Sequence, residues 1–227
     1  DTQDDSSDLD AGWKGGAHHL FVMHGSVTVS DGTVVYMGNG GFEADGLKSG
    51  PDTDTRGDFV PTISNVTVIT TDEASVRDED DSRGMKFDDY FNANFQNVLL
   101  VKADTANGTD CISFSTDGEA EADKINFVGS TMACASEFNG DATFGADSAL
   151  ASTAKTDWFD ASGANARVGS ASDVLAANGF ATNTASTALA TPSTDAVSNY
   201  VGAVSDQLTS SNWYMWVEAA VTAAYND

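Results

Sequence analysis

Hydrophobic positions in residues 1–140 come in short runs that are rich in Val, Ile, Leu and Phe and are separated by Gly, Asp and Asn. No part of this region keeps a helical apolar period for more than about two turns, so the pattern favours strands over helices. The separating residues are those that form tight turns. The predicted strands cover residues 19–23, 33–37, 63–69, 95–101 and 125–128.

Three of these strands repeat at a constant interval. Ile63, Phe95 and Phe127 are 32 residues apart. The same interval separates Asn65, Asn97 and Gly129, and also Val68, Leu100 and Met132. A constant interval of this size is typical of stacked repeats. A second, less regular set of segments places an apolar residue between two polar ones: Asp8-Leu9-Asp10, Glu43-Ala44-Asp45, Lys86-Phe87-Asp88 and Ser113-Phe114-Ser115.

Together the two sets predict an all-β fold in which each winding of the chain contributes one strand from each set. The fold is then a right-handed parallel β-helix, or solenoid, whose coils stack like residues over like at about 4.8 Å. Residues 1–140 form the coils. Residues 141–227 form a loop-rich, Ala/Ser/Thr-rich capping segment, whose aromatic stretches 200–204 and 213–217 plug the last coil. The alternative is a β-sandwich in which the 32-residue interval is coincidental.

Composition excludes several partners. Lys and Arg number 10 against 35 Asp and Glu, 28 of them Asp, which makes the formal net charge −25. Such a chain lacks the clustered cations that nucleic acids and anionic membrane surfaces attract. No apolar stretch approaches the roughly 18 to 20 residues of a membrane-spanning helix. The chain is 41% hydrophobic, which is enough apolar surface for it to fold.

The predicted stacking arranges the acids in columns. Asp10, Asp45 and Asp88 form one outward column, while Asp8 and Glu43 begin a second that continues with Lys86. Two carboxylates about 4.8 Å apart repel by roughly 3 to 4 kcal/mol at an effective dielectric near 20. A partly sheltered column therefore needs a cation or a raised pKa. Ca²⁺ fits because it takes six to eight oxygen ligands in flexible geometry. The alternative is that these acids point into solvent and are screened by salt.

Residues 78–81 are a run of four acids that is either a second calcium site or a solvated loop tip. The candidate calcium ligands are Asp4, Asp5, Asp8, Asp10, Glu43, Asp45, Asp78, Glu79, Asp80, Asp81, Asp88 and Asp89.

The two cysteines, Cys111 and Cys134, lack the spacing of a zinc site. Cys111 opens the fourth member of the second set and Cys134 follows the last member of the first, so both fall at the same end of the stack. We predict a disulfide bond between them. Closing a loop of roughly 20 residues stabilises a protein by about 3 kcal/mol through chain entropy. A disulfide also indicates an oxidising setting outside the cytoplasm.

Other chemistries are less specific. The histidines are His18, His19 and His24, which we interpret as strand-surface residues rather than a transition-metal site. The chain carries no G-x-S-x-G and no H-E-x-x-H motif. A polysaccharide lyase would need calcium beside a basic proton acceptor, and only Arg83 or Lys86 near Asp88 and Asp89 offers that combination. In that alternative these residues line a groove with exposed aromatics such as Tyr90 and Phe91. Glycosylation sequons begin at Asn65 and Asn107.

Several segments, in order along the chain, resemble motifs of one family. Residues 4–15 followed by 41–45 resemble the pattern "DDSIDWDxGWxG … GIEAD". Further matches are residues 61–69, 84–87, 111–114, 133–138, 200–204 and 213–214. These motifs are similar to those of large secreted β-solenoid surface proteins of marine gammaproteobacteria, often labelled lipoprotein or hypothetical protein. This chain resembles the C-terminal half of a typical member, and departs from the pattern in its Ala/Ser/Thr-rich segment and at residues 215–218.

The resemblance implies an abundant exported protein, in or near a family of surface-layer proteins, and it brings no catalytic residues. The expected function is a structural subunit at the bacterial cell surface, extracellular, with Ca²⁺ as cofactor and copies of itself as partners in a surface layer (S-layer). Lipopolysaccharide of the outer membrane is a second expected partner. The alternative function is an extracellular polysaccharide-binding or polysaccharide-lyase module. A solitary acidic protein of a halophile is a third interpretation.

Overall fold

The computed structural model describes residues 5–10, 13–36, 40–48, 60–70, 83–102, 110–183, 188–205, 219 and 221. The candidate ligands Asp4 and Asp78, Glu79, Asp80 and Asp81 lie outside these residues, as do the aromatic stretch 213–217 and the sequon at Asn107.

Strands dominate the described residues, and helices are few and short. The strands are β1 (Asp8–Leu9), β2 (Gly16–Met23), β3 (Ser26–Thr28), β4 (Val34–Tyr36), β5 (Gly40–Asp45), β6 (Thr62–Thr70), β7 (Arg83–Asp88), β8 (Ala93–Lys102), β9 (Ile112–Phe114), β10 (Ile125–Val128), β11 (Thr131–Ala133) and β12 (Ala166–Val168). The helices are α1 (Thr116–Ala120) and α2 (Lys155–Asp160), with 3-10 turns at Ala122–Lys124 and Ala171–Asp173. Within the described ranges no helix is long or apolar enough to cross a membrane.

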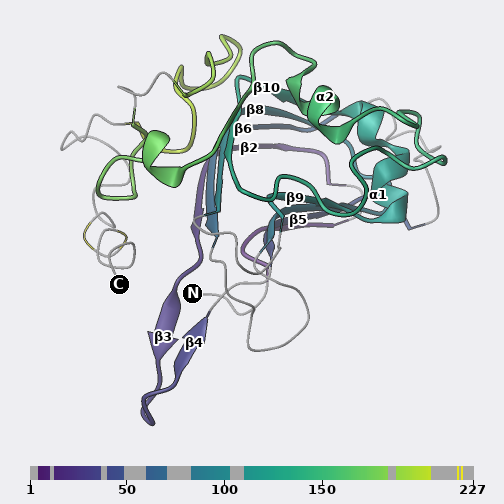
Figure 1. The fold of residues 1–227 in the computed structure, drawn as a ribbon. Coiled ribbons are helices and arrows are strands. Elements are labelled where there is room, and N and C mark those ends of the chain that lie inside the picture. Colours follow the sequence, from purple (N-terminus) through teal and green to yellow (C-terminus); the bar gives the residue numbers. More distant parts are fainter. Residues whose placement is uncertain are drawn as a thin grey trace.

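Two parallel sheets face each other across the core (Figure 1). Sheet A has the strand order β1-β5-β7-β9, and sheet B has the order β2-β6-β8-β11-β12, with β10 also pairing with β8. Successive strands from β5 to β10 alternate between the two sheets, and all the pairs within them are parallel. The all-β prediction is therefore confirmed. The exception to parallel pairing among the named strands is β3–β4, an antiparallel hairpin.

The register of both sheets follows the predicted repeats. In sheet B, Ile63 pairs with Phe95 and Phe95 with Phe127, which are the residues spaced 32 apart. In sheet A, the apolar centres of the polar–apolar–polar segments pair in sequence: Leu9, Ala44, Phe87 and Phe114. Equivalent side chains therefore lie over one another in both sheets, at a constant spacing along the chain in sheet B and at an irregular one in sheet A.

The core between the sheets is a stack of phenylalanines. Phe95 and Phe127, one strand apart in sheet B, lie parallel with ring centroids 4.7 Å apart. Phe87 of sheet A reaches across to Phe95 at 5.6 Å, and Phe42 reaches it at 5.8 Å. All four side chains are buried. Aromatic pairs in these geometries add about 0.5–1.5 kcal/mol each beyond their buried area, so the stacking stabilises the register that produces it.

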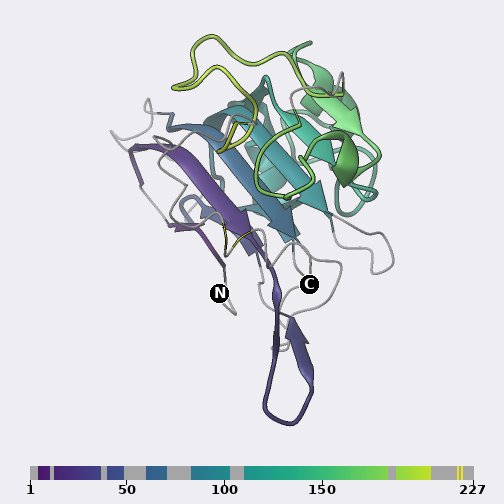
Figure 2. The same ribbon diagram turned by 90° about the vertical axis from the view of Figure 1, so that its left-hand side faces the viewer.

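The outer face of sheet B is also buried, because the C-terminal part of the chain covers it (Figure 2). Leu99 and Val101 of β8 pack in one cluster with Leu175 and Val201. Phe21 of β2 meets Phe180 edge to face at 5.2 Å. Parallel strands covered on both faces are apolar at nearly every position, which is the reason that residues 98–101 read Val-Leu-Leu-Val without alternation.

A column of left-handed backbone positions runs across sheet B and binds this cover. His19, Asn65, Asn97 and Gly129 have φ of 59°, 54°, 55° and 63°, and the first three occupy equivalent places in the registers of β2, β6 and β8. Asn and Gly are the residues that adopt this conformation most readily. Asn65 Nδ2 donates to the carbonyls of Ser198 and Tyr200 at 2.9 and 2.8 Å, and Asn65 Oδ1 accepts from the Ser198 N–H.

The neighbouring members of the same column bind the same segment. Asn97 Oδ1 accepts from the Ser193 N–H at 2.6 Å, and His19 Nδ1 lies 3.2 Å from the Ala203 carbonyl oxygen. We call residues 188–205 the crossing segment, because it runs over three successive strands of sheet B. The prediction that residues 200–204 plug the last coil is wrong: the side-chain amides turn them back across the sheet towards β2. The Asn65 sequon is fully buried, so glycosylation there is incompatible with this fold.

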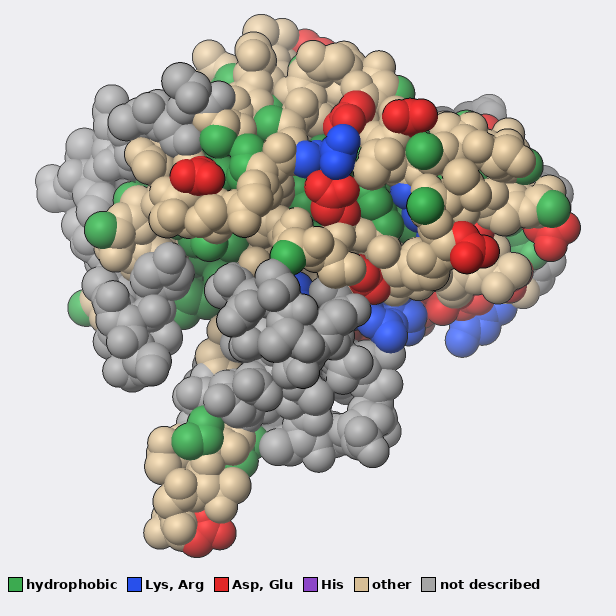
Figure 3. All heavy atoms as spheres, viewed as in Figure 1, with side chains coloured by type: hydrophobic (Ala, Val, Ile, Leu, Met, Phe, Trp, Pro, Cys, Tyr) green, Lys and Arg blue, Asp and Glu red, His purple; other side chains and the backbone are tan. Residues whose placement is uncertain are grey.

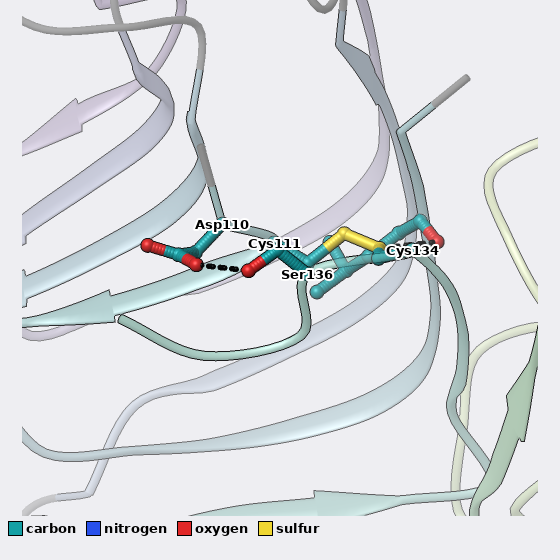
Figure 4. The surroundings of a disulfide bond; sticks show 5 residues. Asp110, Cys111, Cys134 and Ser136 are labelled. Carbon is teal, nitrogen blue, oxygen red and sulfur yellow. Dashed lines mark hydrogen bonds between the residues drawn. A yellow bond between two sulfur atoms is a disulfide. The ribbon is translucent and has the colours of Figure 1, made fainter. Parts of the chain in front are cut away.

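A disulfide bond joins the ends of the two sheets (Figure 4). Cys111 directly precedes β9 of sheet A, and Cys134 directly follows β11 of sheet B. Their Cα atoms are 6.2 Å apart, and both side chains are buried. Beside the bond, the Ser136 hydroxyl donates to Asp110 Oδ1 at 2.5 Å. The predicted pair thus lies at disulfide distance, at the same end of both sheets.

Candidate functional site

The predicted columns of polar side chains stand on the outer face of sheet A. Residues on either side of an inward-pointing residue face outward in a strand, and Ala44 and Phe87 are buried in the core. Asp8 pairs in register with Glu43 and Glu43 with Lys86, while Asp45 pairs with Asp88. Asp10 follows directly after β1 and is exposed. The structure therefore brings Asp8 to Glu43 and Asp45 to Asp88, as the repeats predict.

The column of Asp8, Glu43 and Lys86 contains its own cation. Lys86 Nζ lies 2.5 Å from Glu43 Oε1, and both side chains are mostly sheltered from solvent. A hydrogen bond with the Asp5 carboxyl lowers the pKa of Glu43, and Lys86 and Arg83 act in the same direction. Asp5 Oδ1 also accepts from the Gly40 N–H at 2.8 Å. Glu43 is thus held ionised by groups of the chain itself.

In the column of Asp45 and Asp88, one carboxylate has hydrogen-bond donors and the other has a buried oxygen without one. Asp88 accepts a hydrogen bond from the Ser115 hydroxyl and another, at 2.7 Å, from the Asp89 N–H. Asp45 Oδ1 is buried without a hydrogen-bond partner. Burial, reinforced by the charges of Glu43, Asp88 and Asp89, raises the pKa of Asp45 to about 6. Burial first, and the neighbouring acids second, therefore give Asp45 the raised pKa that was one of the two outcomes expected for the column.

Asp89 ends this edge of the sheet. It has a left-handed backbone (φ 46°) directly after β7, and its carboxylate lies 3.7 Å from the exposed Lys48 ammonium. In the part of the chain that the structure describes, no three side chains of Asp, Glu, His or Cys come together in a group that could hold a metal ion. A calcium ion on this face stays a prediction.

The three histidines make separate contacts. His18 Nδ1 lies 2.7 Å from Ser64 Oγ on the neighbouring strand, and His19 binds the crossing segment. His24 is buried beside Ser6, with Nε2 3.3 Å from the hydroxyl oxygen. Burial and the nearby Lys102 lower the pKa of His24 to about 4. The interpretation of the histidines as strand-surface residues is therefore wrong for His24, which follows β2 and is buried.

Two residues of the lyase alternative lie otherwise than it expects. Phe91 is buried rather than exposed, and it stacks on Phe87 with ring centroids 6.0 Å apart. Lys86 is committed to Glu43. The Asp117 carboxylate raises the pKa of the nearby Tyr90 hydroxyl, which favours the protonated phenol.

Sequence reasoning missed how the capping segment uses its cations. Lys155 of α2 is 1% exposed, and its ammonium lies 2.8 Å from both Glu119 Oε1 and the Asn139 carbonyl oxygen. The same ammonium lies over the rings of Phe114 and Phe144, at 5.6 and 5.7 Å. Nothing in the Ala- and Thr-rich sequence around Lys155 distinguishes it from a surface lysine.

Arg167 of β12 completes this pattern. It bridges Glu137 and Asp160, with N–O distances of 2.9 and 3.0 Å, beside an open cleft of about 640 Å³. Lys124 pairs with Glu121 in the same part of the chain. Most cations that the structure describes are therefore neutralised by acids of the same molecule, which leaves the remaining acids uncompensated.

Comparison with protein-family models, with curated proteins and with solved structures finds no match to this chain. The resemblance to secreted surface proteins is therefore an expectation based on its motifs, and the functional argument depends on the site itself.

Proposed function

We propose that this protein is a right-handed parallel β-solenoid that serves as a structural subunit of a calcium-dependent S-layer on a bacterial cell surface. One observation carries the proposal: the formal charge is −25, and Lys86, Lys155 and Arg167 are occupied by acids of their own chain. Copies of such a molecule meet acid against acid. Association between them then requires counter-ions, and divalent cations that bind carboxylate oxygens are the most effective kind.

The fold suits a structural role. Parallel strands in two facing sheets, a continuous phenylalanine core and a disulfide that joins both sheets make a stiff unit with little dependence on loops. Alternation of the strands between the two sheets, with like residues in register, supports the solenoid. A disulfide bond is also what an extracellular protein tolerates and a cytoplasmic one generally lacks.

Calcium binding at Asp45 and Asp88 would be incomplete within one molecule. Ca²⁺ takes six to eight oxygens, whereas this register pair and the adjacent Asp89 supply only a few. Water or the acids of a neighbouring copy would supply the rest, which couples ion binding to assembly. A bound ion would also stabilise the ionised form of Asp45 and lower its pKa from about 6. Other Ca²⁺ ions would connect acids of the subunits to the phosphates of lipopolysaccharide.

Sedimentation velocity of the full chain tests the proposal. At constant ionic strength, millimolar CaCl₂, in the range of extracellular calcium sites, is expected to convert monomers into large assemblies that EDTA disperses. The double substitution Asp45→Asn with Asp88→Asn is expected to raise the calcium concentration needed. The double substitution Asp173→Asn with Asp195→Asn, which removes two exposed acids elsewhere on the body, is the matched control. Wild-type protein that stays monomeric in calcium, or assemblies indifferent to EDTA, would contradict the proposal.

A further inference from the structure

The β3–β4 hairpin projects from the body of the molecule as an arm (Figures 1 and 2). Its strands pair in antiparallel register, with Ser26 opposite Tyr36 and Thr28 opposite Val34. The turn between them is fully bonded: the Val29 N–H donates to the Thr33 carbonyl and the Gly32 N–H to the Val29 carbonyl, both at 2.9 Å. Gly32 takes the left-handed conformation (φ 86°) that this turn requires. The arm is therefore a regular antiparallel hairpin with a hydrogen-bonded turn.

Among the described residues neither β3 nor β4 pairs with a third strand. An isolated two-stranded hairpin is marginally stable in water, and proteins usually protect such edges with Lys, Pro or bulges within the strands. Residues 25–37 contain no Lys and no Pro, and Asp31 at the tip is their one charged residue in a chain of 35 acids.

The surface of the arm is apolar as well as uncharged. Val34 is 46% exposed and Val29 41% exposed, and both belong to the few large hydrophobic residues that the described surface shows to solvent. In Figure 3 the arm shows hydrophobic side chains on its upper part, near the body, and acidic atoms at its tip. A short, β-branched, uncharged edge is the kind of surface on which another strand adds.

The hydrogen-bond pattern defines what the edge offers. Val29 and Thr33 form a hydrogen-bonded pair, and such pairs alternate with non-bonded ones along an antiparallel ladder. Val27 and Val35 are therefore the next bonded pair. The N–H and C=O groups of Val34 and Tyr36 then point away from β3, towards an incoming strand.

We propose that β4 of this arm pairs antiparallel with β4 of a second copy of the chain, about a two-fold axis at Val35. In this arrangement Val34 of one copy exchanges hydrogen bonds with Tyr36 of the other, and the two Val35 residues form a close, non-hydrogen-bonded pair with Cα atoms about 4.5 Å apart. The contact is isologous, so one surface serves both partners. The inference depends on the proposed function, for which it names one contact between subunits.

Charge favours another arm over any other occupant. Each chain has a formal net charge of −25, so two bodies repel each other at short range. An arm that lay on the acidic body of a neighbour would face carboxylates of that body. Antiparallel pairing of two arms points their tips in opposite directions. The two bodies then lie at opposite ends of the paired arms rather than face to face, which keeps most of their acids apart.

The contact is small. A pair of three-residue strands buries far less than the roughly 1,200 Å² of a stable dimer interface. One arm pair is therefore weak alone, and becomes effective when several contacts form together in an array. Calcium bridges between bodies would provide those other contacts.

Cysteine cross-linking tests the geometry without calcium. Full-length V35C, with the native disulfide retained, is expected to form a covalent dimer under mild oxidation at least tenfold faster than V197C. Val197 is the matched control because it is an exposed valine (58%) on the body. Equal cross-linking rates would overturn the proposal.

Assembly in calcium tests the consequence. V34K is expected to raise the protein concentration needed for assembly at least tenfold, whereas V197K leaves it unchanged, with equal thermal midpoints confirming that both variants fold. If V34K assembles like wild type, the arm is not the contact and the proposed function stands. If no variant assembles in calcium although V35C still cross-links selectively, the arm pairing stands and the proposed function fails.

Discussion

Sheets A and B have the same parallel, in-register construction, yet their outer faces are used in opposite ways. Sheet A has a partly exposed outer face and arranges ionisable side chains on it, with Glu43 bound to Lys86 and Asp45 beside Asp88. Sheet B covers its outer face with the crossing segment and holds that segment with buried amides, chiefly Asn65 and Asn97. Stacking therefore determines which residues are neighbours, and burial under the crossing segment determines how much their contacts contribute to stability.

The energetic difference follows from burial. A partly exposed ion pair contributes about 0–1 kcal/mol because solvent screens it and its side chains lose entropy. A buried amide that loses its partners leaves donors and acceptors unsatisfied, at about 1–3 kcal/mol for each group. We therefore expect substitutions in the Asn column of sheet B to affect folding, and those in the acid columns of sheet A to affect pH and ion dependence.

The largest expected effect is that of Asn65→Ala. It removes the bonds to Ser198 and Tyr200 and forces alanine into a left-handed conformation. We expect a loss of about 4 kcal/mol in the free energy of unfolding, measured by chemical denaturation. Asn94→Ala, which removes an exposed amide of β8 bonded only to Asn126 in the described structure, is expected to cost less than about 0.5 kcal/mol. Equal losses for the two variants would show that the covered amides of sheet B contribute no more to stability than an exposed amide of the same sheet.

The next effect is the pH dependence introduced by His24. Its pKa is about 4 in the folded protein against an ordinary 6.5, so the unfolded chain binds the proton first as the pH falls. The contribution of neutral His24 to the free energy of unfolding is fully present above pH 6.5. It declines as the pH falls from 6.5 to 4, by up to about 3 kcal/mol at 1.36 kcal/mol per pKa unit. His24→Gln is expected to flatten this part of the profile. A variant profile parallel to that of wild type would show that His24 is not the group responsible.

Asp45 should act with the opposite sign and a smaller size. Its raised pKa means that the unfolded chain releases its proton first, so stability falls as the pH rises from about 4 to about 6. Asp45→Asn removes this penalty and is expected to stabilise the calcium-free protein at pH 7 by about 1 kcal/mol, after discounting for solvent exposure. Glu43→Gln, which weakens the Lys86 pair, should instead destabilise by less than about 1 kcal/mol. Thermal unfolding at pH 4 and pH 7 checks both, and a destabilised Asp45→Asn at pH 7 would refute the interpretation.

The parts of the fold that the sequence predicted are those in which similar short segments recur along the chain, whether at the constant 32-residue interval of sheet B or at the less regular spacing of sheet A. Phe95 over Phe127, Phe87 over Phe114 and the pairing of Cys111 with Cys134 all follow from spacing. The path of the crossing segment did not follow, because its contacts link residues far apart in the sequence, such as Asn65 and Ser198, which are 133 positions apart. A usable signal existed in Asn65, Asn97 and Gly129, since Asn and Gly at a constant interval indicate left-handed positions.

The candidate site was predictable as a column but not in its chemistry. Spacing placed Glu43 beside Lys86 and Asp45 beside Asp88, yet it could not show that Ser115 satisfies Asp88 while Asp45 is left without a partner. That difference depends on how α1 begins after β9, where the Ser115 hydroxyl also accepts from the Gly118 N–H. Lys155 was missed because its burial arises from Phe114 and Phe144, which are distant in sequence.

The central claim is that copies of this chain form a surface layer that calcium holds together. Electron cryotomography of envelopes from cells that display the protein tests it most directly, with images taken in calcium, after chelation with EGTA, and after calcium is restored. The account predicts a periodic array that is lost on chelation and returns with calcium. Envelopes without an array in calcium, or with an array that survives chelation unchanged, would contradict it.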